Sequence, residues 1–255
     1  MLKLLYTGSK WVAAGSLLLL LIALLYKDRL PEPDVYQFEE LSDPVQRPTL
    51  RTPFTVETAD QRYRVKPVFE YELEGVIVSY HDADDFSDIW HHDKWQDFLN
   101  VRDLCVIWGD NVANGVYQAM QFDNDSWTCW AYLPDAETAD RFNKTQLSNN
   151  HLLVDDEMIK RELMSAQTGD HIRITGQLVS YENPSNGFLR GTSTRRDDTG
   201  NGACETLFVE NFQILNKANP GWRKLYAIAQ RTLGVSLVLF MILFFITPVT
   251  RPFNN

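Results

Sequence analysis

Two long uncharged apolar runs, one near each end of the 255-residue chain, constrain its fold more than any other feature. The first, residues 11–26, contains five consecutive leucines and would be about 24 Å long as a helix at roughly 1.5 Å per residue. The second, residues 232–249, is equally free of charge. A bilayer core is about 30 Å thick, and Lys10 and Lys27 extend the first span by reaching towards the headgroups. Both runs therefore predict transmembrane helices.

The first run could instead be a cleaved signal peptide, but no small-x-small cleavage site follows Tyr26. Two buried core helices are disfavoured because neither run has the polar stripe of a surface helix. We therefore expect an uncleaved anchor with a short tail at residues 1–10. Two crossings then put this tail on the same side of the membrane as the other tail, residues 250–255.

The side of the membrane that the intervening segment occupies is less constrained. Basic residues near the two runs favour a cytoplasmic domain by a simple count. However, loops longer than about 60 residues cross the membrane largely regardless of their charge. A short basic tail before an apolar run is also the usual form of an export anchor. We expect a protein of the bacterial inner membrane with a periplasmic domain, and a cytoplasmic domain is the alternative.

The segment between the two runs divides into three parts. Prolines recur throughout residues 27–67, which predicts an extended linker or stalk, or alternatively a strap across the folded domain. The folded, β-rich domain is expected at residues 68–216. Residues 217–231 are predicted to form an interfacial helix that leads into the second span.

The strands of the expected domain indicate a small barrel. The pattern Gly-x-aliphatic-Val-Ser-Tyr occurs at residues 75–80 and again at 176–181, which suggests two strands that are each bent at a glycine. Residues 169–215 resemble the later strands of an OB-type barrel. Short helices are predicted within residues 82–100, at 135–147 behind the N-cap Asp135, and at 155–166. The predicted fold class is α+β, a small OB-like mixed β-barrel with inserted short helices, flanked by two transmembrane helices.

The segment "GTSTRRDDTGNGACETLFV", residues 191–209, has the composition of a functional loop. Its Asp-Thr-Gly tripeptide at 198–200 occurs in aspartic proteases, but the chain has no second copy and no apolar strand before this one, so a glycine-rich turn is favoured. Long loops are often binding surfaces. The charged side chains expected to bind a partner, unless they form only a solvated charge cluster, are Arg190, Arg195, Arg196, Asp197 and Asp198.

A cluster of histidines and aspartates in residues 81–93 is a possible metal site, because imidazoles and carboxylates bind zinc and other divalent cations. The candidate ligands are His81, His91, His92 and Asp93. No HExxH motif is present, and the adjacent His91 and His92 would point to different faces of a helix. Packing of this stretch against the barrel is the favoured interpretation, and no cofactor is expected.

The three cysteines do not form CxxC pairs, which disfavours structural zinc and thioredoxin-like chemistry. Cys105 lies within an apolar strand and is predicted to be a buried free thiol. In an exported domain, Cys129 and Cys204 could form a disulfide. Cys204 as a nucleophile would need a nearby histidine, which the sequence cannot identify.

Three segments of the chain, "DLCVIWG" at 103–109, "LSNNHLL" at 147–153 and the pattern "GTSTxRxDTGNGACE" at 191–205, resemble segments of an uncharacterised family of bacterial membrane-anchored proteins. The resemblance implies membrane anchoring and no particular activity.

We expect a non-enzymatic envelope protein whose barrel binds another membrane or envelope protein. The net charge of −10 disfavours nucleic acid as a partner. The alternatives are a metal-dependent or other hydrolase that uses the 81–93 cluster or the 190–205 loop, and a small-ligand sensor.

Overall fold

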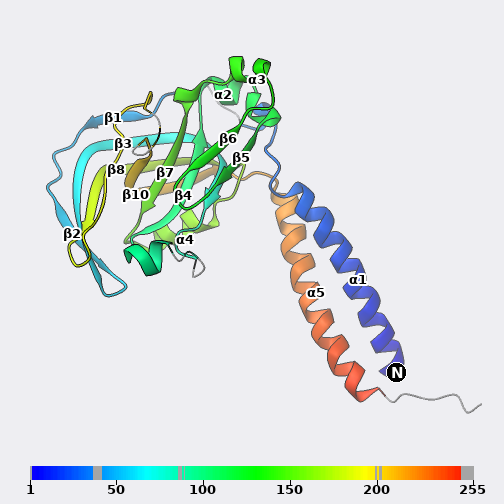
Figure 1. The fold of residues 1–255 in the computed structure, drawn as a ribbon. Helices are drawn as coiled ribbons and strands as arrows, with labels where there is room; N and C mark the ends of the chain where they lie inside the picture. Colours follow the sequence, from blue (N-terminus) through cyan, green and yellow to red (C-terminus); the bar gives the residue numbers. More distant parts are fainter. Residues whose placement is uncertain are drawn as a thin grey trace, which may run out of the picture. The chain divides into compact units, whose positions relative to one another are not determined.

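The chain forms a mixed α+β structure, with a large β-sheet between two long apolar helices in the sequence (Figure 1). This computed structural model describes residues 2–36, 42–85, 88, 90–198, 200 and 203–247. The elements follow in the order α1 (Leu2–Tyr26), η1 (Pro33–Val35), β1 (Val45–Pro48), β2 (Phe54–Thr58), β3 (Gln61–His81), η2 (Trp90–Trp95), β4 (Asn100–Ile107), α2 (Asp110–Ala113), η3 (Val116–Ala119), β5 (Gln121–Asn124), β6 (Cys129–Tyr132), α3 (Ala136–Arg141), η4 (Lys144–Gln146), β7 (Leu147–Leu153), α4 (Glu157–Ser165), β8 (His171–Asn183), β9 (Phe188–Arg190), β10 (Glu205–Asn216) and α5 (Pro220–Ile246).

The two apolar helices pack against each other in antiparallel orientation (Figure 1). The ring of Tyr6 stacks on Phe240 near one end of the pair, and Tyr26 stacks on Trp222 near the other. The buried positions recur every seventh residue on both helices and are Ser9, Ser16, Ala23, Ala229, Ser236 and Leu243. Mostly small residues at such positions let two helices approach closely.

Both helices are long and apolar enough to cross a membrane. Helix α1 includes all of the predicted span 11–26 and most of the predicted tail before it. Helix α5 runs without a break through residues 220–231 of the predicted interfacial segment and residues 232–246 of the predicted second span. The predicted tail, 250–255, lies outside the described residues.

The large sheet is organised around the long strand β3. Its neighbours follow in the order β1-β3-β4-β7-β10-β8-β9, with β2 also paired to β3. Strand β3 pairs in addition with β8 along most of its length. Strands β7 and β10 are parallel, and the other pairs in this sheet are antiparallel. A separate hairpin, β5–β6, lies in the sequence between β4 and β7, and helix α4 connects β7 to β8.

Both glycines of the repeated sequence pattern lie where a neighbouring strand approaches closely. A Cβ atom at Gly75 would lie 2.7 Å from the carbonyl oxygen of Ile107 on β4. A Cβ atom at Gly176 would overlap the carbonyl oxygen of Phe208 on β10. Glycine at these two positions therefore permits the strand spacing that the sheet requires.

The apolar side chains of the strands form one main core and a smaller one. The main core contains Trp108, Leu73, Ile77, Leu104, Ile107, Leu152, Ile172 and Leu207, all fully buried. The smaller core is built around two buried tyrosines, Tyr63 and Tyr181, whose ring centroids are 6.3 Å apart.

The structure corrects the predicted stalk at residues 27–67. The folded unit begins at Leu30 and ends at Ala218, and β1 and β2 belong to its sheet. Tyr36 is buried, and its hydroxyl donates a hydrogen bond of 2.9 Å to the carbonyl oxygen of Gly169. The segment resembles the strap considered above. The many prolines suggested a linker, but a strand can hold proline at an irregular position. Pro67 lies in β3 where this strand pairs only with β8, next to a shift in register that tolerates the missing N–H.

The predicted short helices are shorter than expected. The side chain of Asp135 accepts a hydrogen bond from the Thr138 amide, as an N-cap of α3 should. Helix α4 follows the N-cap Asp156. Among the described residues of 82–100, the only helical element is one π-helical turn, η2. Phe86 and Ile89, two of the apolar positions behind that prediction, lie outside the described residues.

Candidate functional site

The candidate site begins with four side chains on one face of two paired strands. Asp103 and Cys105 are two residues apart on β4, and they lie opposite His151 and Asn149 on β7. Because alternate residues of a strand point to the same face, all four side chains share the face opposite Leu104. Asp103 is fully buried and His151 is 3% exposed, so these polar groups are enclosed by other parts of the domain.

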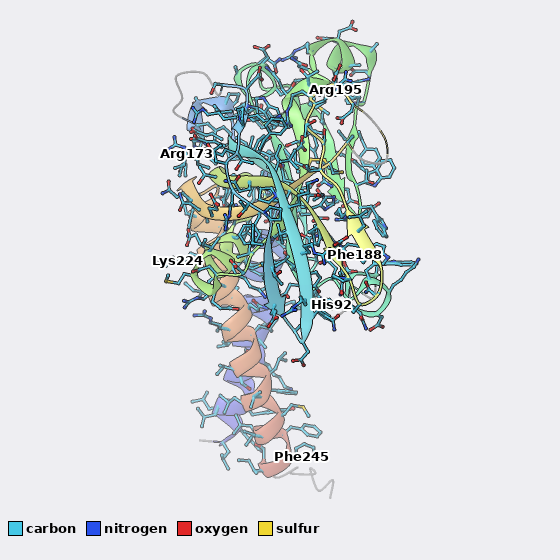
Figure 2. All side chains as sticks on the ribbon, turned by 90° about the vertical axis from the view of Figure 1, so that its left-hand side faces the viewer. His92, Arg173, Phe188, Arg195, Lys224 and Phe245 are labelled. Carbon is cyan, nitrogen blue, oxygen red and sulfur yellow. A yellow bond between two sulfur atoms is a disulfide. The ribbon has the colours of Figure 1, made fainter. Side chains whose placement is uncertain are left out.

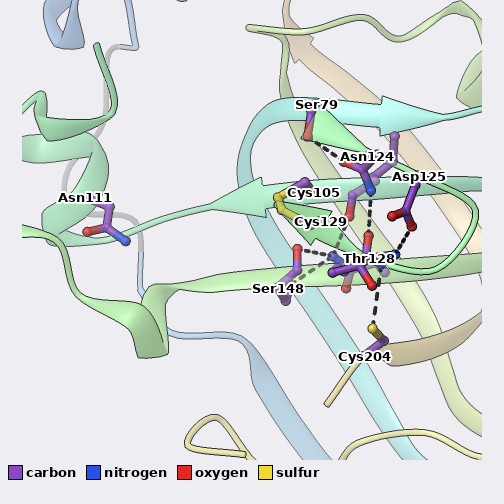
Figure 3. Close-up of a disulfide and its surroundings, with 12 residues drawn as sticks. Ser79, Cys105, Asn111, Asn124, Asp125, Thr128, Cys129, Ser148 and Cys204 are labelled. Atoms are coloured by element: carbon purple, nitrogen blue, oxygen red, sulfur yellow. Dashed lines mark hydrogen bonds between the residues drawn. A yellow bond between two sulfur atoms is a disulfide. The ribbon is translucent and has the colours of Figure 1, made fainter. Parts of the chain in front are cut away.

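A disulfide between Cys105 and Cys129 joins β4 to the β5–β6 hairpin (Figure 3). The predictions of a Cys129–Cys204 disulfide and of a free thiol at Cys105 are therefore wrong. Cys105 points towards the hairpin, and its Cα lies 5.6 Å from that of Cys129, within the usual range for a disulfide. All three cysteines of the chain are described, and Cys204, which is half-buried, is the free one.

A histidine–aspartate pair and the free thiol of Cys204 both lie among these polar side chains. Nδ1 of His151 lies 2.7 Å from Oδ1 of Asp103, in an ion pair that is not an aligned hydrogen bond. Asn149 Nδ2 lies 3.6 Å from Sγ of Cys204, and Sγ lies 3.7 Å from the carbonyl oxygen of Trp127. Figure 3 shows the thiol apart from the disulfide, across a group of hydrogen-bonded side chains.

The electrostatics of the His151–Asp103 pair favour the charged form of both side chains. Burial lowers the pKa of His151, but the Asp103 carboxylate outweighs burial and raises the pKa to about 9. Burial raises the pKa of Asp103, but the His151 imidazolium and a hydrogen bond from Asn100 lower it below its usual value. At neutral pH the buried pair is therefore an imidazolium and a carboxylate.

Arg190 on β9 is a further charged group at this site. It is half-buried, and its guanidinium lies 5.9 Å from the ring centroid of Trp127. It interacts electrostatically with both Asp103 and Cys204. Its Nη1 atom is buried and makes no hydrogen bond within the described part of the chain. A buried donor without a hydrogen bond costs free energy of folding and is rare in native proteins. The unpaired Nη1 atom is therefore a notable feature of this site.

The predicted metal ligands are brought together only in part. His81 and His91 both contact Asp88, with Nε2 of His81 at 2.6 Å and Nδ1 of His91 at 2.8 Å from the same carboxylate oxygen. Ligand atoms of these three residues all lie within 4.8 Å of one another. His92 instead stacks on Phe98, and Asp93 is not part of the group. Asp88 lies within the predicted 81–93 cluster but is not one of the four predicted ligands.

Asn100 determines how this cluster is protonated. Its amide Nδ2 donates a hydrogen bond to Asp103 at 2.9 Å and lies 3.3 Å from Nε2 of His91. Because an amide nitrogen only donates, Nε2 of His91 accepts, and Nδ1 carries the proton that faces Asp88. Burial raises the pKa of Asp88, but hydrogen bonds from His81 and His91 lower it to about 2. The cluster is thus internally hydrogen-bonded, and metal binding at Nδ1 would require the Asn100 contact to break.

Aromatic side chains from three segments meet beside these polar groups. We define the aromatic cluster as Trp90, Trp95, Trp127 and Phe188. The ring centroid of Trp95 lies 3.9 Å from that of Trp127 and 6.0 Å from that of Phe188. Trp90 and Trp127 are 44% and 40% exposed. The cluster therefore offers apolar surface to a ligand or partner.

The predicted partner-binding residues do not form one surface. Arg195 makes an exposed two-point ion pair with Asp197, at 2.9 and 2.8 Å. Figure 2 shows Arg195 and Phe188 towards different ends of the domain. Arg190 alone of the predicted set lies beside the aromatic cluster.

The remaining loop residues bond within the domain. Arg196 forms an ion pair with the buried Glu205, and burial raises the pKa of this carboxyl to about 7. Asp198 accepts a 2.6 Å hydrogen bond from the hydroxyl of Ser193. Thr199 lies outside the described residues. The described contacts of Asp198 and Gly200, to Ser193 and Ala203, stay within the loop, as expected of a glycine-rich turn.

Sequence reasoning missed Asp103, Asn149 and His151. Their only signal was an aspartate that begins the apolar segment "DLCVIWG" and a run of four polar residues within "LSNNHLL". These two segments and 191–205 carried the family resemblance; in the structure β4 pairs with β7, and Asn149 on β7 contacts Cys204 at the start of β10. In comparisons with known proteins, no family model, curated protein or solved structure matches the chain.

Proposed function

We propose that this chain is a non-enzymatic protein of the bacterial inner membrane whose OB-type barrel, on the periplasmic side, binds another membrane or envelope protein. The single observation that carries the proposal is the partly exposed aromatic cluster, which lies where OB-type barrels bind their ligands. Separate features of the molecule support the fold, the binding surface, the kind of partner and the location.

The order of strand pairing supports the OB-type assignment. Numbered along the chain, barrel strands one to five are β3, β4, β7, β8 and β10. The pairs are one–two, two–three, three–five, five–four and four–one, and only three–five is parallel. Helix α4 lies between strands three and four. This circular order, with that helix and one parallel pair, is typical of the OB fold.

The position of the aromatic cluster supports a binding role. OB-type barrels bind ligands on the face of strands two and three, with the loops between strands one and two and between strands four and five. The corresponding parts here are β4, β7 and residues 82–99 and 184–204. Trp90, Trp95 and Phe188 come from these two loops.

The chemistry of the surface supports a protein partner. Interface centres are enriched in tryptophan, tyrosine and arginine, and these residues supply most of the binding energy. Two cations flank the aromatic cluster, since the Lys94 ammonium lies 4.7 Å from the Trp90 ring centroid and Arg190 lies over Trp127. A partner with an apolar patch and a carboxylate beside it fits this surface, whereas the net charge of −10 disfavours nucleic acid.

The disulfide supports a periplasmic location. Disulfides persist in oxidising compartments such as the periplasm and are rare in the cytosol of most organisms. Cys105 and Cys129 form such a bond between β4 and β6. The two long apolar helices provide membrane attachment if they insert.

Cross-linking in intact membranes, followed by purification and mass spectrometry, tests the proposal. We expect a specific cross-linked protein with the wild-type chain, and at least a tenfold weaker product with Trp90→Ser, because truncating a central aromatic residue costs 2 kcal/mol or more. Leu50→Ser is the matched control, since Leu50 is 97% exposed and lies outside the aromatic cluster. Recovery of the chain alone, or equal loss in both variants, would contradict the proposal.

A further inference from the structure

We infer that a group of basic side chains at one end of the helix pair binds the headgroups of anionic phospholipids. We define the basic collar as Lys27 and Arg29, which follow α1, together with Arg223 and Lys224 near the start of α5. Because the folded domain lies between these two helix ends in the sequence, the collar is on the domain side of the membrane when both helices insert. The inference rests on the membrane anchoring and periplasmic location proposed above, and it is independent of the protein partner.

Hydrogen bonds between the two helix ends bring the cations of the collar to the same end of the pair. Nε of Arg223 donates to the carbonyl oxygen of Lys27 at 3.4 Å. Nδ2 of Asn219, the residue before α5, donates to the carbonyl oxygens of Lys27 at 3.3 Å and of Arg29 at 2.6 Å. Lys224 follows Arg223 directly, near the start of α5 (Figure 2). Two cations from each of two distant parts of the sequence therefore meet at one end of the helix pair.

Aromatic side chains place the collar at the level of the headgroups. The Tyr26 ring stacks on Trp222 with the two centroids 4.6 Å apart. The Arg29 guanidinium lies 4.1 Å from the centroid of the Tyr26 ring, and the Lys27 ammonium lies 5.2 Å from that of the Tyr226 ring. Tryptophan and tyrosine are enriched at the membrane–water interface, where their rings lie among the headgroups. In a bilayer, the helix pair therefore holds Lys27 and Arg29 beside the lipid phosphates.

The charge of the collar is strongly positive. In the unit that contains both helices, residues 1–29 and 219–255, the sequence has a single acidic residue, Asp28. Asp28 forms an ion pair with Lys27, and the side chains of Arg29 and Lys224 are exposed. Four cations are thus accompanied by one carboxylate, although the whole chain has a net charge of −10. Such a cluster of basic residues beside a transmembrane helix is typical of binding to anionic lipids.

Neither helix stability nor membrane orientation explains all four cations. The helix dipole favours Lys27 and Arg29 after the C-terminal end of α1, but it disfavours Arg223 and Lys224 near the N-terminal end of α5. The positive-inside rule places an excess of basic residues on the cytoplasmic side of a membrane. A periplasmic domain puts the collar on the opposite side, where anionic headgroups compensate its charge.

The chemistry of the collar fits a phosphate that carries acyl chains. Guanidinium groups, such as those of Arg29 and Arg223, bind phosphate oxygens through two parallel hydrogen bonds, and lysine ammonium groups add compact positive charges. Apolar surface for the acyl chains begins next to the collar. Leu25 is 68% exposed, and Ile228, which lies one turn from Lys224 on the same face of α5, is 51% exposed. A phospholipid therefore fits this surface better than a free phosphate ion.

Native mass spectrometry of the purified full-length chain, in a non-ionic detergent, tests the inference. The probes are phosphatidylglycerol, which is anionic, and phosphatidylcholine with the same acyl chains, which has no net charge. Each basic residue near an anionic surface contributes about fivefold in affinity. We therefore expect phosphatidylglycerol to bind about 25-fold or more tightly than phosphatidylcholine. Arg223→Gln/Lys224→Gln should remove about 25-fold of the phosphatidylglycerol affinity and leave that of phosphatidylcholine unchanged.

Two further variants serve as a control and as a second test of the collar. Lys3→Gln/Lys10→Gln removes two cations nearer the opposite end of α1 and should keep the full preference. Arg29→Gln/Lys224→Gln removes two exposed side chains of the collar and should lose as much affinity as the first variant. Equal binding of the two lipids by the wild-type chain, or the same loss in Lys3→Gln/Lys10→Gln, would overturn the inference. Displacement of phosphatidylglycerol by inorganic phosphate, but not by sodium chloride of equal ionic strength, would indicate a site for a free anion and would also overturn it.

An alkaline carbonate wash of the membranes separates this inference from the proposed function. A chain that is retained in the membrane but shows no preference for phosphatidylglycerol would overturn the lipid site alone. Release of the chain by carbonate would contradict the membrane anchoring on which both proposals depend.

Discussion

The disulfide between Cys105 and Cys129 allows a quantitative prediction. Replacing both residues by alanine frees the β5–β6 hairpin from β4, and the two residues are separated by 24 positions in the sequence. The loop-closure relation for a loop of this length gives about 12 cal/mol/K of unfolded-state entropy, or about 3.5 kcal/mol at 25 °C. We therefore expect the double variant to lose about 3.5 kcal/mol in free energy of unfolding.

Urea unfolding of the full-length chain, followed by tryptophan fluorescence, measures this loss. The buried Trp108 is a suitable reporter because it lies within the main core. With a slope of about 2 kcal/mol per molar urea, the midpoint should fall by about 1.7 M. Cys204→Ala is the matched control, since it removes a cysteine and keeps the disulfide. A double variant that unfolds at the wild-type midpoint would refute the reasoning.

Two further predictions concern single side chains. Asp156→Ala removes the hydrogen bonds that the N-cap carboxylate accepts from the amides of Met158 and Ile159. The free energy of unfolding, measured in urea, should fall by about 1 kcal/mol. An unchanged midpoint would show that the cap does not contribute to stability. Glu205 has a folded-state pKa of about 7, raised by burial from 4.5, so its contribution to stability is full below pH 4.5 and is lost as the pH rises through 7. The free energy of unfolding should fall between pH 5 and pH 7, and Glu205→Gln should remove this part of the slope in unfolding measured at each pH. If the slope persists in the variant, another group is responsible.

Features with a local cause were predictable from the sequence. The two apolar runs form long helices because every residue in them can face an apolar environment. Asp135 caps α3 because its carboxylate needs to reach only three residues along the chain. The alternating apolar residues within 169–215 form β8 and β10 because their period matches the alternation of a strand.

Features that depend on strand register were not predictable in this way. The sequence does not reveal that Cys105 lies opposite Asn149 and faces the hairpin, and this orientation selects Cys129 as its disulfide partner. Residues 27–67 were predicted to be a linker because prolines disfavour central strands, but β1 and β2 within this range pair only with β3.

The site itself depends on strand register. The sequence shows Asp103 at the start of the apolar run of β4 and His151 at the end of a polar run in β7, and neither pattern indicates which way these side chains face. The contact between Asp103 and His151 depends on the β4–β7 register, and the contact between Asn149 and Cys204 depends on where β10 begins beside β7. Neither register follows from the sequence alone.

Site-specific photo-cross-linking in living cells tests the central claim most directly. A photoreactive phenylalanine analogue replaces Trp90 in the aromatic cluster, and the same analogue at Leu50 is the control, since both side chains are exposed. We predict a discrete adduct with one membrane or envelope protein from position 90 and none from position 50. No adduct from position 90, or the same adducts from both positions, would contradict a partner-binding surface at the loops of this barrel.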